Sequence, residues 1–313
     1  MTSTAPLRWV TEAYCLKCGT ADDCTSMGGC LASSTRAARV ESVTLAIRFM
    51  TEHLSEPLQL ADVARVGLLS PFHFHRVFRQ ITSTTPARFL TSLRMADARR
   101  LLLVTTNNVT EICTEVGYSS LGTFISQFGR LAGMSPTRFR DRVRQVGGTH
   151  VGDLAMPADR AMSEGPVGPV TGVVLGSGYA LLGMYRAGSA HDWPTVFELT
   201  KTGRITRTDP LVDGRYIPIA VGLNPETTVR EALTTPTGPP GLIGFDSKAV
   251  IVHHGEVVRP FHVVLRRRRL FDPPVEVTRP LIALASTTSA RHVTTGAFRR
   301  LASSRLFGGK VGT

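Results

Sequence analysis

The sequence has no apolar run that approaches the roughly 18 residues needed to span a membrane. Its first ten residues also lack the apolar core of a secretory signal peptide. Hydrophobic residues make up 42% of the 313 residues, close to the value of globular proteins, which excludes wholesale disorder. We therefore expect a soluble, cytoplasmic protein with no membrane partner, and the chain length favours about two domains.

Lysine is absent between residues 36 and 148, although this segment holds 15 arginines against 8 acidic residues, a net charge of +7. The whole chain carries +12 at pH 7. Cationic side chains that neutralise phosphates release condensed counterions, so this excess favours a nucleic-acid partner. An arginine-rich codon bias in a basic housekeeping protein is the alternative.

Two motifs of hydrolytic enzymes are also missing, since there is neither an HExxH zinc motif nor a GxSxG nucleophile elbow. The C-terminal half has imidazole groups at His191, at His253-His254 and at His262. Adjacent residues of a strand point to opposite faces, so His253 and His254 are not expected to share one metal ion. We expect no catalytic residues and no enzyme.

Composition divides the chain into an α-helical part followed by a β part. The predicted segments are a cysteine-containing extension at 1–35, a helical domain at 36–146, a linker at 147–168, a β domain at 169–285 and a disordered tail at 286–313.

A helix–turn–helix pattern begins at Leu60–Val66, where apolar residues at i, i+3, i+4 and i+6 predict one buried helix face. The chain then turns at Gly67–Leu69. Ser70-Pro71 is an N-cap followed by a proline at the first helical position, and it predicts a second helix over Phe72–Ile81. The inward side chains of that helix are Phe74, Val77, Phe78 and Ile81.

The pattern recurs about fifty residues later. Val109–Val116 repeats the first helix, and Gly117 suits a left-handed turn. Ser119 or Ser120 then caps a helix over Leu121–Leu131. This second helix has Phe124, Phe128 and Leu131 on its inward face.

Two further helices are predicted from Thr85-Pro86 to about Leu102 and after Ser135-Pro136. The first is about 25 Å long. This length suits a helix that connects two DNA-binding units, because successive major grooves lie about 34 Å apart. Its arginines Arg88, Arg94, Arg99 and Arg100 are expected to be largely free. The pattern thus predicts an all-α tandem helix-turn-helix domain that binds double-stranded DNA.

Residues 41–144 resemble the DNA-binding domain of AraC/XylS-family transcription regulators. The residues that carry the resemblance are Leu60, Val63-Ala64, Ser70-Pro71, Phe78-Arg79, Pro86, Arg94, Ala98, Ile112, Val116–Ser119, Phe124, Phe128, Gly133–Pro136 and Phe139-Arg140. The resemblance implies two recognition helices in adjacent major-groove segments, sequence-specific DNA binding and transcription regulation. RNA polymerase and a small-molecule or protein effector are the further partners it suggests.

The resemblance also assigns residues of the two recognition helices to DNA. In the first helix they are Phe72, His73, His75 and Arg76, and in the second Gly122, Thr123, Ile125, Ser126 and Gln127. Phosphate contacts fall to Arg79, Arg130 and Arg138, with Arg88 as a further candidate. Because the second helix lacks basic residues at its reading positions, we expect the first to supply most sequence readout. Leu68 and Ser83 replace glycines that are usual in the family, which predicts locally altered turns.

The C-terminal half contains short Val-rich runs between turn signals, which predict a small antiparallel β-sandwich. The predicted strands are Val170–Leu175, Tyr179–Tyr185, Thr195–Leu199, Arg215–Val221, Ala249–His253 and Val257–Arg266. Val170-x-Gly172-x-Val174, Asp213-Gly214-x-Tyr216 and Asp272-Pro273-Pro274 give it a resemblance to transthyretin-like or carboxypeptidase-regulatory-like sandwiches, and imply a sensing or interaction domain. Arg266–Arg269 is interpreted as a solvated strand edge, with a supplementary DNA backbone contact as the alternative.

Four cysteines cluster near the N-terminus at a density that argues for metal ligands in a reducing compartment. They are Cys15, Cys18, Cys24 and Cys30. Zinc or an iron–sulfur cluster fits thiolate ligands, although the spacing is that of no standard finger. A metal- or redox-responsive regulator is therefore the alternative function, and incidental thiols in an N-terminal extension are the simpler one. Cys113 corresponds to Ala64 and is expected in the core.

Overall fold

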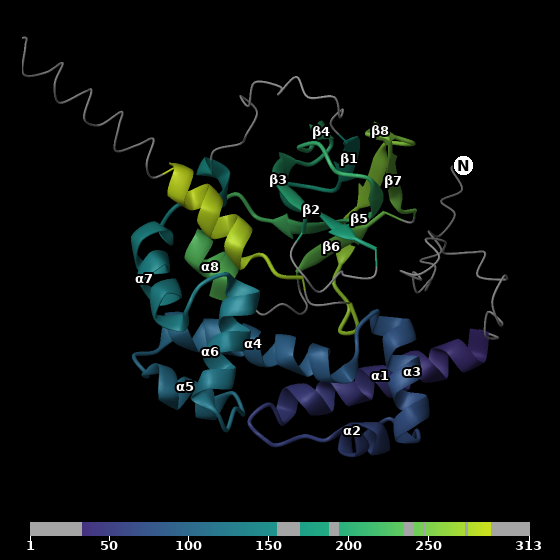
Figure 1. The fold of residues 1–313 in the computed structure, drawn as a ribbon, viewed down its shortest axis with the longest axis vertical. Coiled ribbons are helices and arrows are strands. Elements are labelled where there is room, and N and C mark those ends of the chain that lie inside the picture. Colours follow the sequence, from purple (N-terminus) through teal and green to yellow (C-terminus); the bar gives the residue numbers. More distant parts are fainter. Residues whose placement is uncertain are drawn as a thin grey trace, which may run out of the picture.

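The computed structural model describes residues 33–154, 170–187, 194–234, 241–246, 248–272 and 275–288. A helical region comes first, and a mostly antiparallel β region follows it (Figure 1). Over the described residues, no helix is both long and apolar enough to cross a bilayer.

The helical region confirms the predicted helices, with boundaries that differ by a few residues. Its helices are α1 (Ser33–Glu52), α2 (Leu60–Val66), α3 (Pro71–Thr82), α4 (Pro86–Val104), α5 (Val109–Glu115), α6 (Leu121–Ala132) and α7 (Pro136–Val146). We call α1–α3, together with the start of α4, the first helical unit and α5–α7 the second helical unit. Helix α4 runs between them (Figure 1), and α1 has no counterpart among the predicted helices.

Each helical unit is built around three phenylalanines. In the first unit the ring centroids of Phe74 and Phe78, and those of Phe78 and Phe89, lie 5.4 Å apart. In the second unit the corresponding rings are those of Phe124, Phe128 and Phe139, at 6.0 and 5.5 Å. The residues of the two sets are 50 positions apart, so the sequence repeat is also a repeat of the core.

Helix caps hold the starts of three of the predicted helices. The side-chain oxygens of Thr85, Ser120 and Ser135 accept hydrogen bonds from the backbone N–H three residues later, each at 3.4 Å. The second helix of the repeat is therefore capped by Ser120. At α3 the prediction was wrong for the side chain, because Ser70 is the N-cap residue but its hydroxyl makes no capping bond.

The two turns that lack the family's usual glycine keep the glycine-like conformation. Leu68 and Ser83 have φ values of +56° and +61°, and Gly117 and Gly133 have +82° and +74° in the second unit. The expectation of locally altered turns was wrong. Each non-glycine residue instead adopts the left-handed conformation at a cost of about 1 kcal/mol.

The strands of the β region form two sheets. The described strands are β1 (Thr171–Leu175), β2 (Tyr179–Arg186), β3 (Val196–Lys201), β4 (Ile205–Arg207), β5 (Gly214–Leu223), β6 (Leu242–Phe245), β7 (Val250–His253), β8 (Glu256–Val257), β9 (Phe261–Val264) and β10 (Arg266–Arg267). The smaller sheet has the order β4-β1-β9, and the larger has β10-β6-β5-β2-β3 with the β7–β8 hairpin beside β5.

The structure adds elements that the sequence patterns did not predict. These are β4, β6, helix α8 (Val229–Thr234) and a helix over 278–288, which includes the first three residues of the expected tail. Strands β1 and β9 pair in parallel, with Val173 opposite His262, so the expectation of an entirely antiparallel region was wrong. Residues 1–32 and 289–313 lie outside the described residues.

Both faces of the larger sheet are covered. In β2, Ala180, Leu182 and Met184 join the cluster shared with the smaller sheet, whereas Leu181 joins the cluster of the second helical unit. Tyr185 packs with the isoleucines of β5 and β6 on that second side. Continuous burial along a strand is typical of a sheet covered on both faces. The helices therefore form one of the two covers.

The start of the expected linker is packed against the C-terminal region. Val151 and Leu154 are buried, and residues 151–153 form a 3₁₀ turn. The Val151 N–H donates to Thr227 O at 2.9 Å, and the Arg230 N–H donates to Gly147 O at 2.9 Å. These bonds attach the end of α7 to the segment that leads into α8. Residues 155–168 of the expected linker lie outside the described residues.

Candidate nucleic-acid interface

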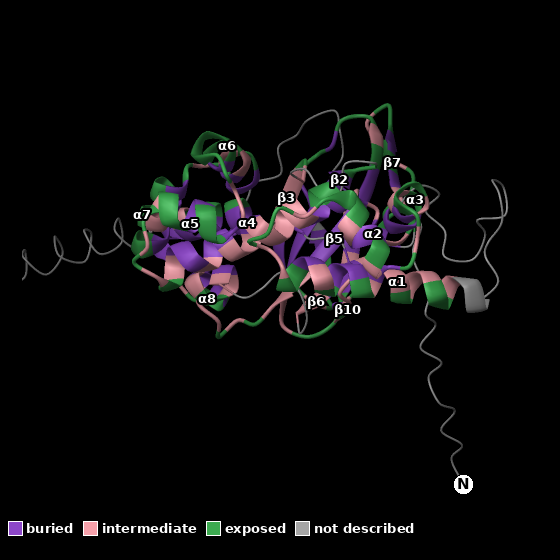
Figure 2. Cartoon of the chain, turned by 90° about the horizontal axis from the view of Figure 1, so that it is seen from below, coloured by how far each residue is buried: buried purple, intermediate pink, exposed green. Residues whose placement is uncertain are grey.

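Helices α3 and α6 lie toward the same side of the molecule. Figure 2 shows both helices toward the upper side of the view, with α1 and α8 below them. Each of the two helices follows a short helix and a tight turn, and each buries two phenylalanines on the inner face. Their outer faces are therefore available to a common ligand.

The outer face of α3 carries an aromatic and two basic side chains. Phe72 is 84% exposed, and Arg76 and Arg79 are exposed as well. His75 is half-buried. His73 is also half-buried, and its Nε2 atom is buried with no hydrogen-bond partner among the described residues. The structure thus leaves Phe72, Arg76 and Arg79 as the more prominent of the predicted contacts on this helix.

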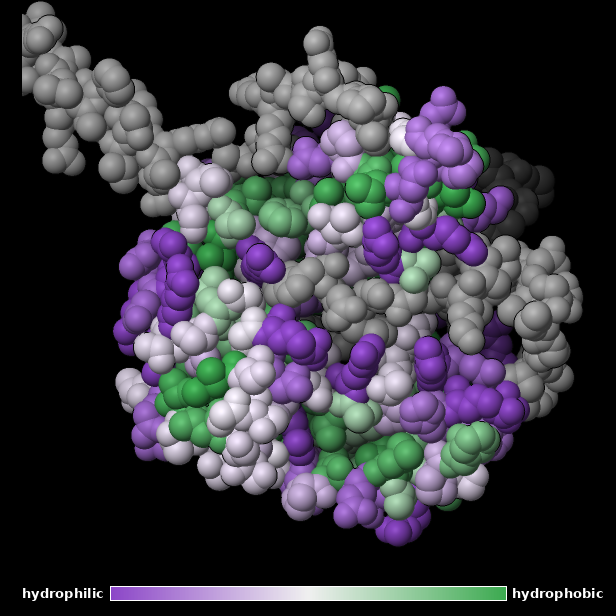
Figure 3. All heavy atoms as spheres, in the orientation of Figure 1, coloured by the Kyte–Doolittle hydropathy of each residue, from purple (hydrophilic) through white to green (hydrophobic). Residues whose placement is uncertain are grey.

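The outer face of α6 is neutral by comparison. Gly122, Thr123 and Ser126 are exposed, and Ile125 is 39% exposed. The side-chain amide oxygen Oε1 of Gln127 accepts hydrogen bonds from Nε and Nη2 of Arg130, at 3.2 and 3.1 Å. Figure 3 shows a mostly white and green surface over α5 and α6, whereas strongly hydrophilic side chains gather near α3.

The helix that follows each of these two carries one predicted phosphate-binding arginine. Arg88 in α4 and Arg138 in α7 are exposed, and each is the third residue after the capping side chain. They are 50 residues apart. The two arginines therefore occupy equivalent positions in the first turns of α4 and α7.

Several arginines of α4 and α7 that sequence reasoning left free are structural. Arg94 donates from Nε to Leu54 O at 2.9 Å and from Nη2 to Glu56 O at 2.6 Å. Arg140 repeats this arrangement with Leu102 O and Asn107 O, at 2.9 and 2.6 Å. Arg94 thus holds the loop before α2, and Arg140 holds the loop before α5. These two residues are therefore not available to DNA.

The other two arginines of α4 are also engaged. Arg99 is buried and forms an ion pair with Glu276 of the C-terminal region. Arg100 pairs with Asp97 at 2.8 Å. The expectation that Arg94, Arg99 and Arg100 are free was wrong, because the helical periodicity of α4 did not reveal which elements would cover its second face.

Gly117 lies where the two helical units meet. A Cβ atom at this position would collide with the carbonyl oxygen of Leu54 and would lie 2.9 Å from Nη2 of Arg94. The guanidinium of Arg94 also lies 5.7 Å from the ring centroid of Tyr118. Burial lowers the pKa of Arg94 and raises that of Tyr118. The turn of the second unit is therefore packed on the loop of the first.

The described residues contain no cluster of three metal-binding side chains. Cys15, Cys18, Cys24 and Cys30 lie outside the described residues. Cys113 is buried as predicted, and burial raises the pKa of its thiol, which disfavours the reactive thiolate.

The C-terminal imidazoles are arranged differently from the prediction. Strand β7 ends at His253, and His254 has a φ of +50° in the following turn. The two rings therefore lie side by side, with centroids 4.1 Å apart and planes tilted by 47°, and the expectation of opposite faces was wrong. Asp213 organises this turn by accepting hydrogen bonds from the N–H groups of His254 and Gly255, at 2.8 and 3.0 Å.

The interpretation of Arg266–Arg269 as a strand edge is confirmed for Arg266–Arg267, which form the edge strand β10, but the expected solvation of the run was wrong. The carboxylate of Asp272 accepts two hydrogen bonds from Arg266, at 2.8 and 2.7 Å. Arg268 is buried, and Arg269 lies over the ring of Phe271. Arg267 alone of the four is exposed, so most of this run is packed against the rest of the protein.

Residues 63–142 match a family model described as a helix-turn-helix domain. The raffinose operon transcriptional regulatory protein RafR of Pediococcus pentosaceus is 30% identical over 112 residues, 36% of this chain and 40% of RafR. The MmsAB operon regulatory protein of Pseudomonas aeruginosa is 35% identical over 97 residues, 31% of this chain and 32% of that protein. The middle of the chain is therefore an AraC-type helix-turn-helix domain, and its relatives are AraC/XylS-family regulators.

Solved structures match about a third of the chain. The DNA-binding domain of AdpA in complex with a target DNA is 28% identical, with a TM-score of 0.33, and the match covers 33% of this chain and 94% of that one. A transcriptional regulator with an AraC-type DNA-binding domain from Chromobacterium violaceum is 29% identical, with a TM-score of 0.33, 36% of this chain and 99% of that one. This chain spans only about a third to two fifths of the length of RafR and the MmsAB regulator.

Proposed function

We propose that the chain is a sequence-specific DNA-binding transcription regulator that places α3 and α6 in two adjacent major-groove segments. The observation that carries the proposal is the repeat itself. Two helices of the same length, each following a short helix and a tight turn, expose their outer faces on one side of the molecule. Successive major grooves on one face of a duplex offer two such sites about 34 Å apart.

Helix α3 is the main reader of base sequence in this proposal. Arg76 is suited to guanine O6 and N7, and the exposed ring of Phe72 to a thymine methyl group. The neutral residues of α6 contribute position and shape readout. Arg79, Arg88 and Arg138 bind phosphates, which explains why the arginine-rich helical region accounts for +7 of the net charge.

The proposal extends to the wider role of the protein. Relatives named as operon regulators support a regulator that meets RNA polymerase at promoters and has no catalytic activity of its own. A metal- or redox-sensing role of the four N-terminal cysteines is not part of the proposal, because they lie outside the described residues.

Selection of bound sequences from a random duplex library by the full chain tests the proposal. We expect one enriched motif, and a hydroxyl-radical footprint with two protected segments about one helical turn apart. A footprint confined to one segment contradicts the use of both helices. Failure to enrich any sequence contradicts sequence-specific binding altogether.

Two arginine variants check the orientation of the bound chain. Arg79→Ala on α3 should weaken binding equally on all duplexes and reduce the salt slope by about 1, as expected for one lost phosphate contact. The matched control is Arg48→Ala, an exposed arginine of α1, the helix that lies below α3 in Figure 2. An equal change in both slopes would mean that α3 does not face the DNA.

A further inference from the structure

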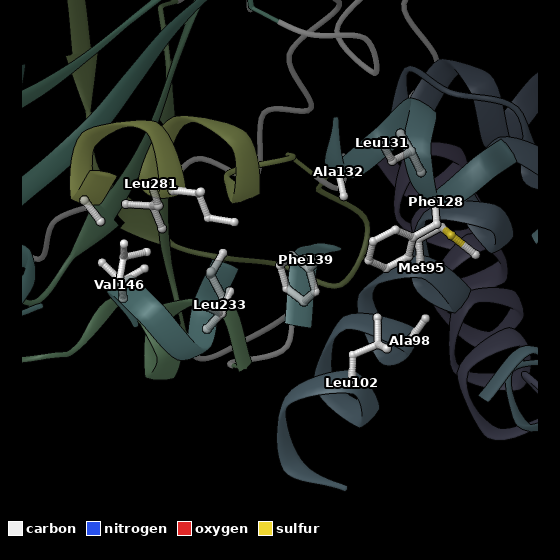
Figure 4. Packing of buried hydrophobic residues seen from close by; sticks show 14 of the residues in the cluster. Met95, Ala98, Leu102, Phe128, Leu131, Ala132, Phe139, Val146, Leu233 and Leu281 are labelled. Carbon is white, nitrogen blue, oxygen red and sulfur yellow. The ribbon is translucent and has the colours of Figure 1, made fainter. Parts of the chain in front are cut away.

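The C-terminal region is fused to the second helical unit. A single apolar cluster contains Ala98 and Leu102 of α4, Phe139 of α7, Leu233 of α8 and Leu281 of the last helix (Figure 4). A contiguous apolar core of this kind has no boundary at which the parts could separate. The second unit and the C-terminal region therefore move as one body.

Polar contacts reinforce the same junction. The ion pair of Arg99 and Glu276 is buried, with 5% and 12% of the two side chains exposed. Arg230 at the start of α8 donates to Leu103 O at the end of α4, at 3.1 Å. Glu276 also accepts hydrogen bonds from the backbone and the hydroxyl of Thr278, which begins the last helix. Separation at this junction would leave buried charges unpaired.

The first helical unit has a much smaller attachment to the C-terminal region. Among the apolar residues packed against its core cluster, only Leu270 and Phe271 come from the C-terminal half of the described chain. They lie in the loop that leaves β10 and descends from the larger sheet toward α1 and α3 (Figure 1). We call β10 together with the loop that follows it, residues 266–272, the foot loop.

The foot loop is held in shape before it meets the helices. Asp272 is buried, and its carboxylate binds the guanidinium of Arg266 through both oxygens and accepts the Arg269 N–H at 2.7 Å. The Arg268 N–H donates to Gly241 O at 2.8 Å. Burial lowers the pKa of Arg268 to about 10, so it stays charged at neutral pH. A loop fixed by these bonds presents Leu270 and Phe271 as a rigid projection.

We infer that Leu270 and Phe271 of the foot loop are positioning residues that fix the first recognition helix relative to the second. The C-terminal region, already one body with the second unit, thereby sets the spacing at which the protein reads its two DNA segments. This inference rests on the proposed function. Simultaneous binding by two linked heads gains affinity only if their separation matches that of the two sites, so a fixed separation selects one spacing.

The experiment compares the full chain with its Leu270→Ala/Phe271→Ala variant on duplexes taken from the selected motif. One duplex carries both segments, one has the segment of α3 scrambled, and one has an extra base pair between the segments. We expect the variant to bind the intact duplex about tenfold more weakly and to lose most of its preference over the duplex with the extra base pair. Binding to the duplex with only the α6 segment should be unchanged.

Arg267→Ala is the matched control, because Arg267 is the exposed arginine of the same loop. We expect it to bind all three duplexes as the unaltered chain does. If Arg267→Ala weakens binding and lowers the salt slope, the loop contacts the DNA backbone, and the positioning role is overturned. An equal loss by the double variant on all three duplexes overturns it as well.

Hydrogen exchange of the DNA-free chains tests the inference independently of DNA binding. In the double variant, and to a lesser degree in the conservative Phe271→Leu variant, amides of α1–α3 should exchange faster while those of α5–α7 keep their protection. Unchanged exchange in α1–α3, or equal acceleration in both units, overturns the inference. A chain that selects no DNA sequence yet shows the expected exchange pattern contradicts the proposed function and leaves the positioning contact in place.

Discussion

The two helical units have the same backbone and core but different surroundings. Their phenylalanines repeat at 50 residues, and Arg94 and Arg140 tie down the entering loops through the same pair of guanidinium nitrogens. On the outside, α3 presents Arg76 and Arg79, whereas Arg130 is the single charged residue of α6. The first unit has the more basic reading surface, and the second shares its core with the C-terminal region.

This difference shows that the two copies of a structural repeat can have different roles. Repetition of the inward-facing residues preserves the framework in both copies. The outward-facing residues are not constrained by packing and have diverged. In our proposal, the first unit therefore supplies most of the sequence readout, and the second unit anchors the protein and links DNA to the C-terminal region.

Removal of the buried cation that joins the second unit to the C-terminal region should have the largest effect. Arg99→Ala leaves Glu276 buried without its partner, and we expect the free energy of unfolding to fall by about 3–5 kcal/mol in urea titrations. Arg100→Ala, which breaks the neighbouring and more exposed pair with Asp97, should cost no more than about 1 kcal/mol. Similar losses in the two variants would contradict a structural role specific to Arg99.

A methyl group at the junction of the two units should have the next largest effect. Gly117→Ala combines a left-handed φ with a collision against Leu54 O, and we expect a loss of about 3 kcal/mol in the free energy of unfolding. The control is Gly122→Ala in α6, where the nearest atom to an added Cβ is 3.9 Å away. That substitution should be neutral or stabilising by up to about 1 kcal/mol. Equal stability of the Gly117→Ala and Gly122→Ala variants in thermal and urea unfolding would contradict the close packing at Gly117.

Equivalent residues of α3 and α6 should differ in their effect on DNA recognition. Arg76→Ala should cost about 1–3 kcal/mol of binding free energy and relax the preference at one base pair. Ser126→Ala, at the position 50 residues later, should cost less than about 0.5 kcal/mol. Binding titrations against the selected motif and its single-base variants measure both. A loss for Arg76→Ala that is the same on every sequence would assign Arg76 to phosphate.

The smallest effect concerns the turn in which the two units differ. Leu68→Gly should relieve the left-handed strain at a side chain that is 88% exposed, and raise the free energy of unfolding by about 0.5–1 kcal/mol. Gain of stability in urea titrations with unchanged DNA affinity is the expected result. A destabilised Leu68→Gly chain would show that the leucine side chain makes a contact worth more than the strain.

Local signals explain why the helical region could be predicted from sequence. The apolar periodicity of α2 and α5, the proline-marked starts of α4 and α7, and the left-handed Gly117 depend on residues within one or two turns. The strands predicted at Tyr179–Tyr185 and Arg215–Val221 correspond to β2 and β5, and they could be predicted for the same reason, because short apolar runs and turn residues are short-range features. The inward stripe of α3 and its exposed Phe72 and Arg76 were predicted in the same way.

The missed features depend on residues far apart in the chain. Arg99 meets Glu276 across 177 positions, and nothing in the periodicity of α4 distinguishes it from the exposed Arg88. The parallel pairing of β1 with β9 joins strands that are far apart in the chain. The ring of His253 lies beside that of His254 because His254 adopts a left-handed backbone conformation. A charge run such as Arg266–Arg269 gave no signal that Asp272 would fold it into a loop.

The sequence by itself determined the repeat, the helix starts, the inward faces of α3 and α6 and the excess of arginine on the helical region, since each follows from spacing, capping or charge within a short segment. The tertiary structure decided which arginines remain exposed, how both faces of the larger sheet are covered and how the C-terminal region attaches to each unit. These depend on which distant surfaces bury one another, and burial against a distant partner leaves no local pattern in the chain.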